Sequence, residues 1–339
     1  MMTFDYAGYY RRLQDLKQLQ IPAEAVRWTE RYEPPARSRR MVLYLGCNIL
    51  RTPDLAADVV AVFTALGFDF VAVAGVQFCC GITWDRHAEA ATGQAVATTT
   101  VDRLASFKPS LVVHWCPSCD VHFSEVVTGR DGRELPFEVT SAAALLAGLA
   151  REGRIPWQRP TPIRAVLHSH VGVPGHHHGQ RRARDDRDHG AEILRSMPGV
   201  EFLGSLDAPP ELDYDCGPSS AALARSRWLD IRAGLWSTMQ QSGANVVVTK
   251  SHACQREWSD LASEALDVRC YISLVADALG LVRDYASNPL AALKRSGGPD
   301  QVVQLTRPSW TSHGLTEGEA GEIAARYDWP GRSDQVPQP

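Results

Sequence analysis

The chain has 339 residues, of which 44% are hydrophobic, and a formal net charge of −4. Its length and apolar content predict about two domains with buried cores. A general nucleic-acid or membrane-surface role needs a basic excess, so we expect no nucleic-acid partner. The N-terminus lacks the basic and apolar segments of a leader, and no stretch reaches the roughly 20 apolar residues of a membrane helix. A cytoplasmic protein without an integral membrane segment is therefore expected.

The placement of the cysteines is the most informative feature. Five of the eight fall in three groups within 73 residues: Cys47, the pair Cys79-Cys80, and the C-x-x-C of Cys116 and Cys119. Because thiols stay reduced in the cytoplasm, this pattern indicates metal ligands or redox groups rather than structural disulfides.

Residues 1–40 are expected to form a helical arm and a linker. Beyond them, short apolar runs rich in β-formers alternate with helical patterns. The predicted strands cover 41–46, 69–74 and 111–115, and the predicted helices cover 53–66, 85–106 and 120–127. This alternation predicts a parallel sheet covered by helices, because parallel neighbours need crossover connections.

Each cysteine group stands at or just past the carboxyl end of a predicted strand. In open α/β sheets, ligands bind at that edge, so the fold would gather three distant groups at one place. Cys119 would lie in the first turn of a helix, where the helix dipole favours a thiolate over a thiol.

A second half with the same order of elements follows a linker over 150–162. Strand 165–168 corresponds to 42–45, Asp215-Cys216-Gly217 to the Cys-Cys-Gly run, and the strand before Ser251 and Cys254 to the one before Cys116. Two landmarks repeat at offsets of 136 and 135 residues, which indicates a duplication. We therefore predict two pseudo-symmetric Rossmann-like α/β domains with parallel sheets, over 41–160 and 161–285. The cysteine site would lie near their interface, and 286–339 would form a tail.

With these residues in hand, the first half resembles the cysteine-rich CCG domain found in the B component of heterodisulfide reductases and in iron–sulfur subunits of glycolate and lactate oxidation systems. The order and spacing of the five cysteines match that pattern, with 31 residues before the Cys-Cys pair and 35 after it. The second half resembles the same domain weakly, since only Cys216 and Cys254 remain of its five positions. The resemblance covers roughly 41–285.

The resemblance implies a cluster site and a redox function. The implied cofactor is one [4Fe-4S] cluster, of non-cubane type, and its implied ligands are Cys47, Cys79, Cys80, Cys116 and Cys119. An ordinary cubane needs four thiolates, so a fifth cysteine fits a different cluster or a spare thiol. The implied activity is that of an oxidoreductase subunit in thiol- or disulfide-linked electron transfer. Its partner would carry cubane clusters or flavin, and its substrate would be a small thiol or disulfide.

Two other functions stay open. The chain could be a pure electron-transfer subunit of a glycolate- or lactate-type dehydrogenase complex. It could also be a zinc-bearing interaction protein, since zinc takes four nitrogen or sulfur ligands. No Gly-rich phosphate loop follows a strand, so nucleotide or flavin binding by this chain is not indicated.

The second half leaves its own alternatives. His168 and His170 could join Cys216 and Cys254 in a mixed site for zinc or iron, or could belong to a polar loop. Other side chains could line a substrate pocket, namely Asp215, Ser251 and His252. Cys270 is expected to be a core thiol, and the mixed charges of 181–188 are expected to form a solvated face.

Overall fold

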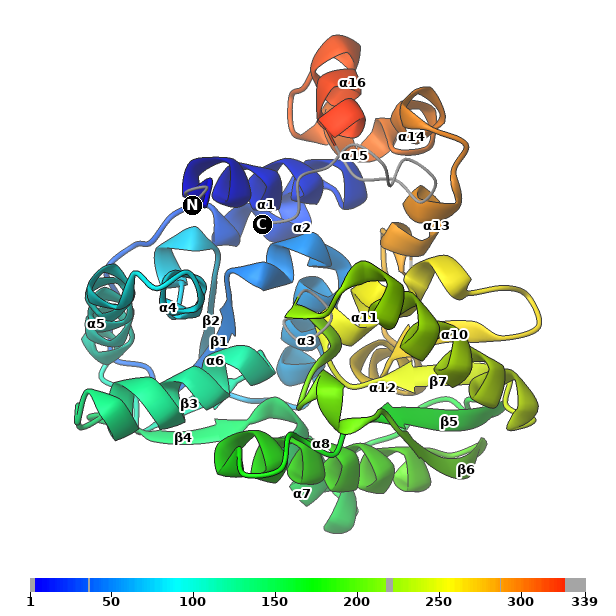
Figure 1. Ribbon diagram of the computed structural model, residues 1–339, viewed down its shortest axis with the longest axis horizontal. Helices are drawn as coiled ribbons and strands as arrows, with labels where there is room; N and C mark the ends of the chain where they lie inside the picture. The colour runs from blue at the N-terminus through cyan, green and yellow to red at the C-terminus, as the bar shows by residue number, and fades with distance from the viewer. Residues whose placement is uncertain (1–3, 36, 218–221, 287, 327–339) are drawn as a thin grey trace.

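Two parallel sheets organise the molecule (Figure 1). The computed structural model describes residues 4–35, 37–217, 222–286 and 288–326. Each sheet has four strands, and all strand pairs are parallel. Helices lie between successive strands, which confirms the predicted α/β architecture in two halves.

The first sheet has the strand order β2-β1-β3-β4. Its strands are β1 (Met41–Gly46), β2 (Phe70–Ala74), β3 (Leu111–His114) and β4 (Glu138–Ser141). In the register, Met41 pairs with Phe70 on one side and with Leu111 on the other. β1 is therefore central, and its side chains are buried from Val42 onward, as expected for a strand covered on both faces.

The first half contains helices at the three predicted places, and α7 (Ala142–Arg151), which was not predicted. The helices are α3 (Pro53–Ala65), α4 (Ile82–Arg86), α5 (Ala90–Ser106), α6 (Pro117–His122), which continues as a π-helical turn over Phe123–Arg130, and α7. The prediction of one helix over 85–106 is wrong, because Ala88 adopts φ +62° and separates α4 from α5. Gly67, predicted to follow α3, has φ +76°, a left-handed conformation typical of a helix end.

The second half repeats the topology of the first. Its strands are β5 (Ile163–Ser169), β6 (Val200–Asp207), β7 (Val246–Thr249) and β8 (Asp267–Cys270), in the order β6-β5-β7-β8. The helices are α8 (His177–Ser196), α10 (Arg225–Gln241), α11 (His252–Trp258) and α12 (Tyr271–Ala278). Strand for strand, this is the order of the first sheet, so the repeat predicted from the sequence has a counterpart in the fold.

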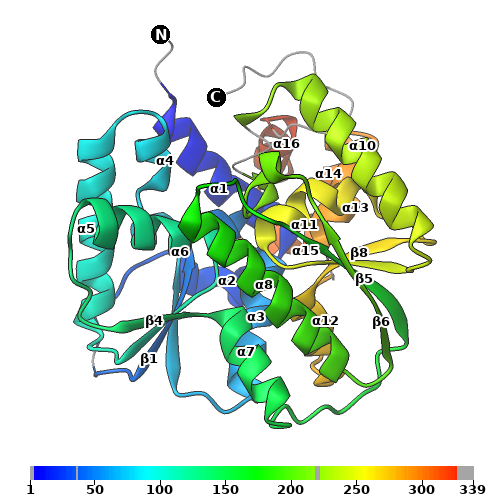
Figure 2. The ribbon, with the colours of Figure 1, turned by 60° about the horizontal axis from the view of Figure 1, so that its bottom comes forward.

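The two halves share one hydrophobic core. Figure 2 shows α3, α7, α8 and α12 between the two sheets. Residues of both halves join a single buried cluster, among them Leu43, Phe63, Leu167 and Ile272. The rings of Trp115 and Tyr271 also stack across this boundary, with centroids 5.8 Å apart. The arrangement of the halves is therefore held by core packing.

The N-terminal arm packs against C-terminal helices at the top of the view in Figure 1. The arm contains α1 (Tyr6–Gln20) and α2 (Ala23–Val26), and the C-terminal segment contains α13 (Pro289–Arg295), α14 (Pro299–Leu305), α15 (Arg307–Ser312) and α16 (Glu317–Arg326). Leu19 of the arm joins Leu293, Val302 and Trp310 in a separate buried cluster. The region expected to be a tail is thus largely helical as far as Arg326.

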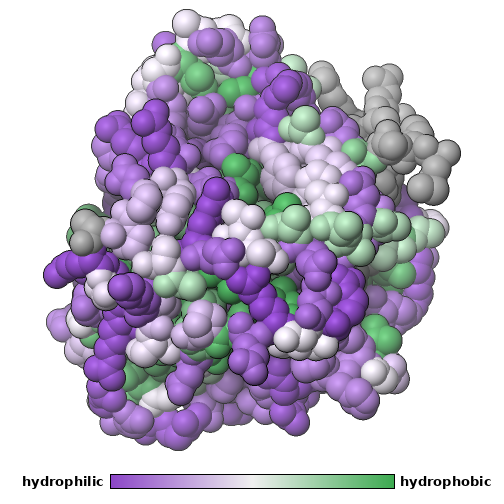
Figure 3. All heavy atoms as spheres, turned by 90° about the vertical axis from the view of Figure 1, so that its left-hand side faces the viewer, coloured by the Kyte–Doolittle hydropathy of each residue, from purple (hydrophilic) through white to green (hydrophobic). Residues whose placement is uncertain are grey.

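One face of the molecule is mostly polar. On the side seen in Figure 3, hydrophilic residues dominate and hydrophobic ones form small patches. Within the described residues, none of the helices combines the length and the apolar character that a membrane span requires.

Candidate cysteine-rich metal centre

The three cysteine groups meet at the carboxyl edge of the first sheet. Cys47 directly follows β1, Cys79 and Cys80 follow a short turn after β2, and Cys116 begins α6 just after β3. The sulfur atoms of Cys47 and Cys79 lie 3.7 Å apart. All five side chains are buried, with at most 6% exposed at Cys47. The structure therefore brings the five predicted ligands together.

The strand order explains why the site forms here. From β1 the chain crosses to β2 on one side, and the later β3 lies on the other side, so the connections diverge at the β1–β3 boundary. Such a switch point opens a crevice at the carboxyl ends of the strands. Gly46, with φ +73°, turns the chain there, and an added Cβ would lie 2.8 Å from the Cys119 sulfur. Because glycine has no side chain, Gly46 leaves room for the Cys119 thiol.

One thiolate is favoured at Cys79. Hydrogen bonds from Cys47 and Cys80 lower the pKa of Cys79 well below its ordinary value, and the hydroxyl of Tyr10 and the backbone N–H of Gly81 add to this effect. The Tyr10 oxygen lies 3.2 Å from the sulfur. The arm helix α1 thus contributes a hydrogen bond to the centre.

A second thiolate is favoured at Cys116. A hydrogen bond from Cys119 lowers the pKa of Cys116 well below its ordinary value, and His252 of the second half acts in the same direction. Conversely, the bond to Cys116 raises the pKa of Cys119. Within this pair, the hydrogen bond therefore favours a thiolate at Cys116 rather than at Cys119, where the helix start predicted one.

The four side chains of the mixed His/Cys alternative in the second half also lie together. His168, His170, Cys216 and Cys254 are buried, and their ligand atoms all lie within 4.8 Å of one another. We call this group the His-Cys tetrad. It occupies the β5–β7 switch point of the second sheet, which corresponds to the β1–β3 switch point of the first.

The residues predicted to line a substrate pocket lie between the two thiol groups. Ser251 caps α11 by accepting a hydrogen bond from the Cys254 amide, and its hydroxyl donates to Asp215. Burial raises the pKa of Asp215 well above its ordinary value, and the nearby Cys254 and Cys116 raise it further. With His252, these residues are at most 3% exposed. Their role in a substrate pocket stays a prediction.

A buried chain of ion pairs crosses between the halves beside the centre. Asp120 of α6 accepts hydrogen bonds from His114 at 3.2 Å and from Arg182 of α8 at 3.1 Å. Arg182 also pairs with Asp186 at 3.0 Å, and Lys250 lies 3.3 Å from Asp186. The prediction of a fully solvated face at 181–188 is therefore wrong for Arg182 and Asp186, which connect α6 to the loop before α11.

An open groove of ≈ 480 Å³ lies beside the cysteine centre. Its walls come from both halves and include Asp85, Arg86 and His122 of the first and His176 and Tyr214 of the second. His122 stands three residues after Cys119, and burial lowers its pKa to about 4. The groove is therefore lined by a neutral imidazole and by charged side chains. Its lining begins two residues after Cys80 in one segment and two residues after Cys119 in another.

Two contributors to the site escaped prediction from the sequence. Tyr10 lies in an arm that is distant in sequence from the cysteines, and nothing in its helical pattern signals a contact with Cys79. Gly46 did carry a signal, because a glycine between a buried strand and a cysteine fits a position that needs a positive φ.

Comparisons with known proteins agree with this geometry. Residues 41–124 match the cysteine-rich CCG domain, a segment that contains all five cysteines of the centre. The chain is also similar to the D component of dihydromethanophenazine:CoB–CoM heterodisulfide reductase from two species. For the protein of Methanosarcina barkeri the identity is 26% over 255 residues, and for that of Methanosarcina mazei it is 26% over 259 residues.

Each match covers 71% of this chain and 59% of the relative. The chain thus spans about three fifths of the length of these relatives. The domain match ends at residue 124 and does not cover the second half. The likeness between the two halves therefore rests on their shared strand order. Both relatives are the D component of their reductase, and likeness to the B component stays a prediction.

Proposed function

We propose that the chain binds one iron–sulfur cluster through Cys47, Cys79, Cys80, Cys116 and Cys119 and acts as a redox subunit. The observation that carries this proposal is the convergence of five buried thiols from three loops at one switch point. Several buried thiolates need compensating positive charge, which iron ions would supply.

The arrangement of the thiols favours a cluster over a single zinc ion. One zinc takes four ligands at one centre, and this set offers five. Among the described residues, the His-Cys tetrad is the group whose ligand atoms gather closely enough for a single ion. The five thiols form a wider set, as suits a cluster whose irons each take their own ligand. A non-cubane [4Fe-4S] cluster would use the fifth thiol.

The chain's own residues would hold, tune and shield the cluster. When bound, the cluster would supply one-electron transfer. Tyr10 would donate a hydrogen bond to Cys79, and His252 would do the same to Cys116. Burial of all five cysteines would keep water away from the sulfurs, and Cys47 and Cys79 lie with Trp115 in the shared core.

Thiol or disulfide chemistry is the proposed use of those electrons. The two similar proteins are named as parts of a heterodisulfide reductase, which supports a disulfide substrate. The groove beside His122 is the proposed entry for such a small molecule. Electrons would then come from a partner protein carrying cubane clusters or flavin.

Spectroscopy on the anaerobically reconstituted protein tests this function. We expect cluster absorption and an EPR signal that changes when a small thiol is added to the oxidised protein. The variant Arg86→Ala should weaken the dependence on thiol concentration and leave the cluster absorption intact. A cluster EPR signal that does not change with any thiol or disulfide would favour the pure electron-transfer subunit. Protein that contains zinc but no sulfide would favour the zinc-bearing interaction protein.

A further inference from the structure

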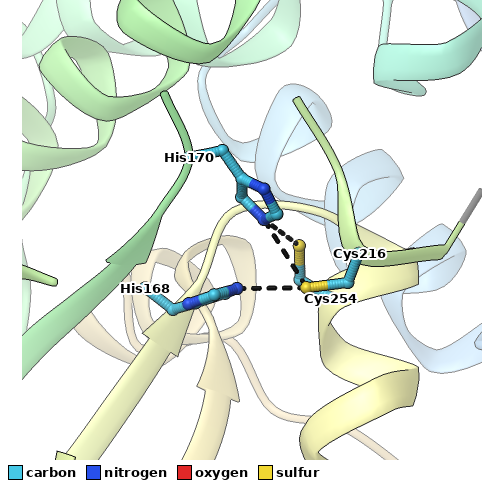
Figure 4. A group of neighbouring side chains, drawn as sticks. All are labelled: His168, His170, Cys216 and Cys254. Atoms are coloured by element: carbon cyan, nitrogen blue, oxygen red, sulfur yellow. Dashed lines mark hydrogen bonds between the residues drawn. The ribbon is translucent and has the colours of Figure 1, made fainter. Parts of the chain in front are cut away.

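The His-Cys tetrad has the composition and shape of a site for one metal ion. Figure 4 shows the four side chains pointing toward one another. His168 comes from β5, His170 follows the same strand, Cys216 follows the loop after β6, and Cys254 lies in the first turn of α11. Nε2 of His168 lies 3.1 Å from the Cys216 sulfur, and Nε2 of His170 lies 3.5 Å from both sulfurs.

These separations fit the edges of a zinc tetrahedron. With Zn–N of about 2.0 Å and Zn–S of about 2.3 Å, a tetrahedral ion holds its nitrogen and sulfur ligands about 3.5 Å apart. Two of the three measured separations equal that edge, and the third is shorter by a few tenths of an ångström. The remaining pairs lie within 4.8 Å, so side-chain shifts of up to about 1 Å would close the tetrad around an ion.

The tautomer of His170 is already suited to a metal. Its Nδ1 lies 3.1 Å from the carbonyl oxygen of Leu212, and a carbonyl can only accept, so Nδ1 carries the hydrogen. Nε2 then presents a lone pair toward the two sulfurs. This second hydrogen bond is the one that metal-binding histidines use to fix their orientation. His168 is held instead by ring contacts with His170 and Trp258.

Burial and charge point to a closed site rather than a catalytic one. All four side chains are 0% exposed. Four protein ligands complete the coordination of zinc, and a structural site leaves no position for water. Both cysteines belong to a hydrophobic cluster with Trp228, Trp258 and Met239. Two thiolates would cancel the charge of Zn²⁺, so the whole unit could stay neutral in these apolar surroundings.

We propose that the second half binds one structural Zn²⁺ through Nε2 of His168, Nε2 of His170, and the sulfurs of Cys216 and Cys254. The site would stand at the position that corresponds to the cluster site of the first half. It would fix the start of α11, where His252, two residues before Cys254, interacts with Cys116. The zinc would thus hold a contact of the cysteine centre in place.

Metal analysis of the intact chain tests the proposal. We expect about one zinc per chain after purification, as for a closed four-ligand site. Cys254→Ala and His170→Ala should each lose it. Cys270→Ala is the matched control, because Cys270 is equally buried but stands in the shared core, away from the tetrad, and it should keep its zinc. Zinc retained by Cys254→Ala would overturn the assignment.

Cobalt binding to the unaltered chain gives a readout that does not depend on how the variants fold. After removal of zinc with a chelator, one Co²⁺ should bind and give visible bands of tetrahedral coordination, together with a sulfur-to-cobalt charge-transfer band. Equimolar Zn²⁺ should erase both. A chain that takes up no cobalt, or that is purified with a single iron at these four residues, would contradict the proposal.

The zinc proposal and the cluster proposal can fail separately. Cys79→Ala should remove iron and sulfide and leave the zinc at its original level. If the same variant lost zinc and the Cys254→Ala variant kept it, the zinc would belong to the five-cysteine centre and the tetrad would be a hydrogen-bonded core.

Discussion

The hydroxyl of Tyr10 lies 3.2 Å from the sulfur of Cys79, although the two residues are 69 positions apart. The contact makes the N-terminal arm part of the cysteine centre. Asn48, next to Cys47, strengthens this connection by donating a hydrogen bond of 2.9 Å to the hydroxyl of Tyr9. Helix α1 therefore packs over the centre with two consecutive tyrosines.

Removing the Tyr10 hydroxyl should change the redox potential of the centre. Hydrogen bonds to the sulfurs stabilise the more negative, reduced state, so Tyr10→Phe should shift the midpoint potential to a more negative value. Redox titration followed by EPR measures this shift. Tyr9→Phe is the control, since its hydroxyl bonds to Asn48 and not to a sulfur. Equal potentials for all three proteins would show that the Tyr10 hydrogen bond does not tune the centre.

Gly46 should be needed for the assembly of the centre. In Gly46→Ala, the new Cβ would lie 2.8 Å from the Cys119 sulfur, so this thiol must move. We expect the iron content after reconstitution to fall severalfold. Gly67→Ala is a matched control, because Gly67 has a similar φ of +76° but open space around it. It should lose only about 1 kcal/mol of stability, from the unfavourable φ. Normal iron content in Gly46→Ala would contradict the packing argument.

The ion pairs of Arg182 should contribute strongly to stability. Arg182→Ala leaves Asp120 and Asp186 buried without their shared partner, which should lower the free energy of unfolding by about 3–5 kcal/mol. Arg181→Ala, one residue away, removes a side chain that is 48% exposed and should change stability by less than about 1 kcal/mol. Denaturant unfolding measures both, and equal effects would mean that the buried pairs add nothing.

Asp54 should make stability fall as pH rises. Burial raises its pKa from 3.8 to about 7, and nearby Asp58 adds to the effect. The native state therefore holds a proton on Asp54 that the unfolded state releases. The contribution of Asp54 to the free energy of unfolding is fully present below pH 3.8 and is lost as the pH rises through 7. A shift of this size corresponds to up to about 4 kcal/mol.

The neutral analogue Asp54→Asn should remove this dependence. Thermal unfolding should show a higher Tm than for the unaltered chain at pH 8 and a smaller difference at pH 5, where only part of the Asp54 contribution has been lost. Asp58→Asn provides the contrast, because Asp58 pairs with Arg283 at 2.5 Å and its loss should destabilise the protein at both pH values. An Asp54→Asn variant that is less stable at pH 8 would contradict the argument.

Local sequence patterns predicted the strands and helices near the cysteines better than the helix break at Ala88 and the C-terminal helices. Strand 41–46 and the helix after Pro53 were predictable because a buried apolar run and a capped, periodic stripe are signals within a few residues. The break at Ala88 was not, since its φ of +62° depends on how α5 returns past Gly81. The helices beyond residue 288 are short, and they are stabilised by a separate core with Leu19 of the arm.

The residues of the site likewise fall into those that local sequence patterns predict and those that depend on distant packing. The five cysteines were predictable because each stands at the end of a strand in its own half, and the tetrad because its histidines mark the end of β5. The contacts of Tyr10 and of His252 with thiols cross from the arm and from the second half into the centre. They depend on packing between distant segments, which no spacing in the sequence records.

The most direct test of the account is the iron and acid-labile sulfide content of anaerobically reconstituted protein. The unaltered chain and Cys270→Ser should each hold about four iron and four sulfide per chain. Substitution of Cys47, Cys79 or Cys116 by Ser should abolish or sharply reduce both. Protein that holds zinc but no sulfide, or cysteine variants that keep their full iron and sulfide, would contradict the assignment of the cluster to these thiols.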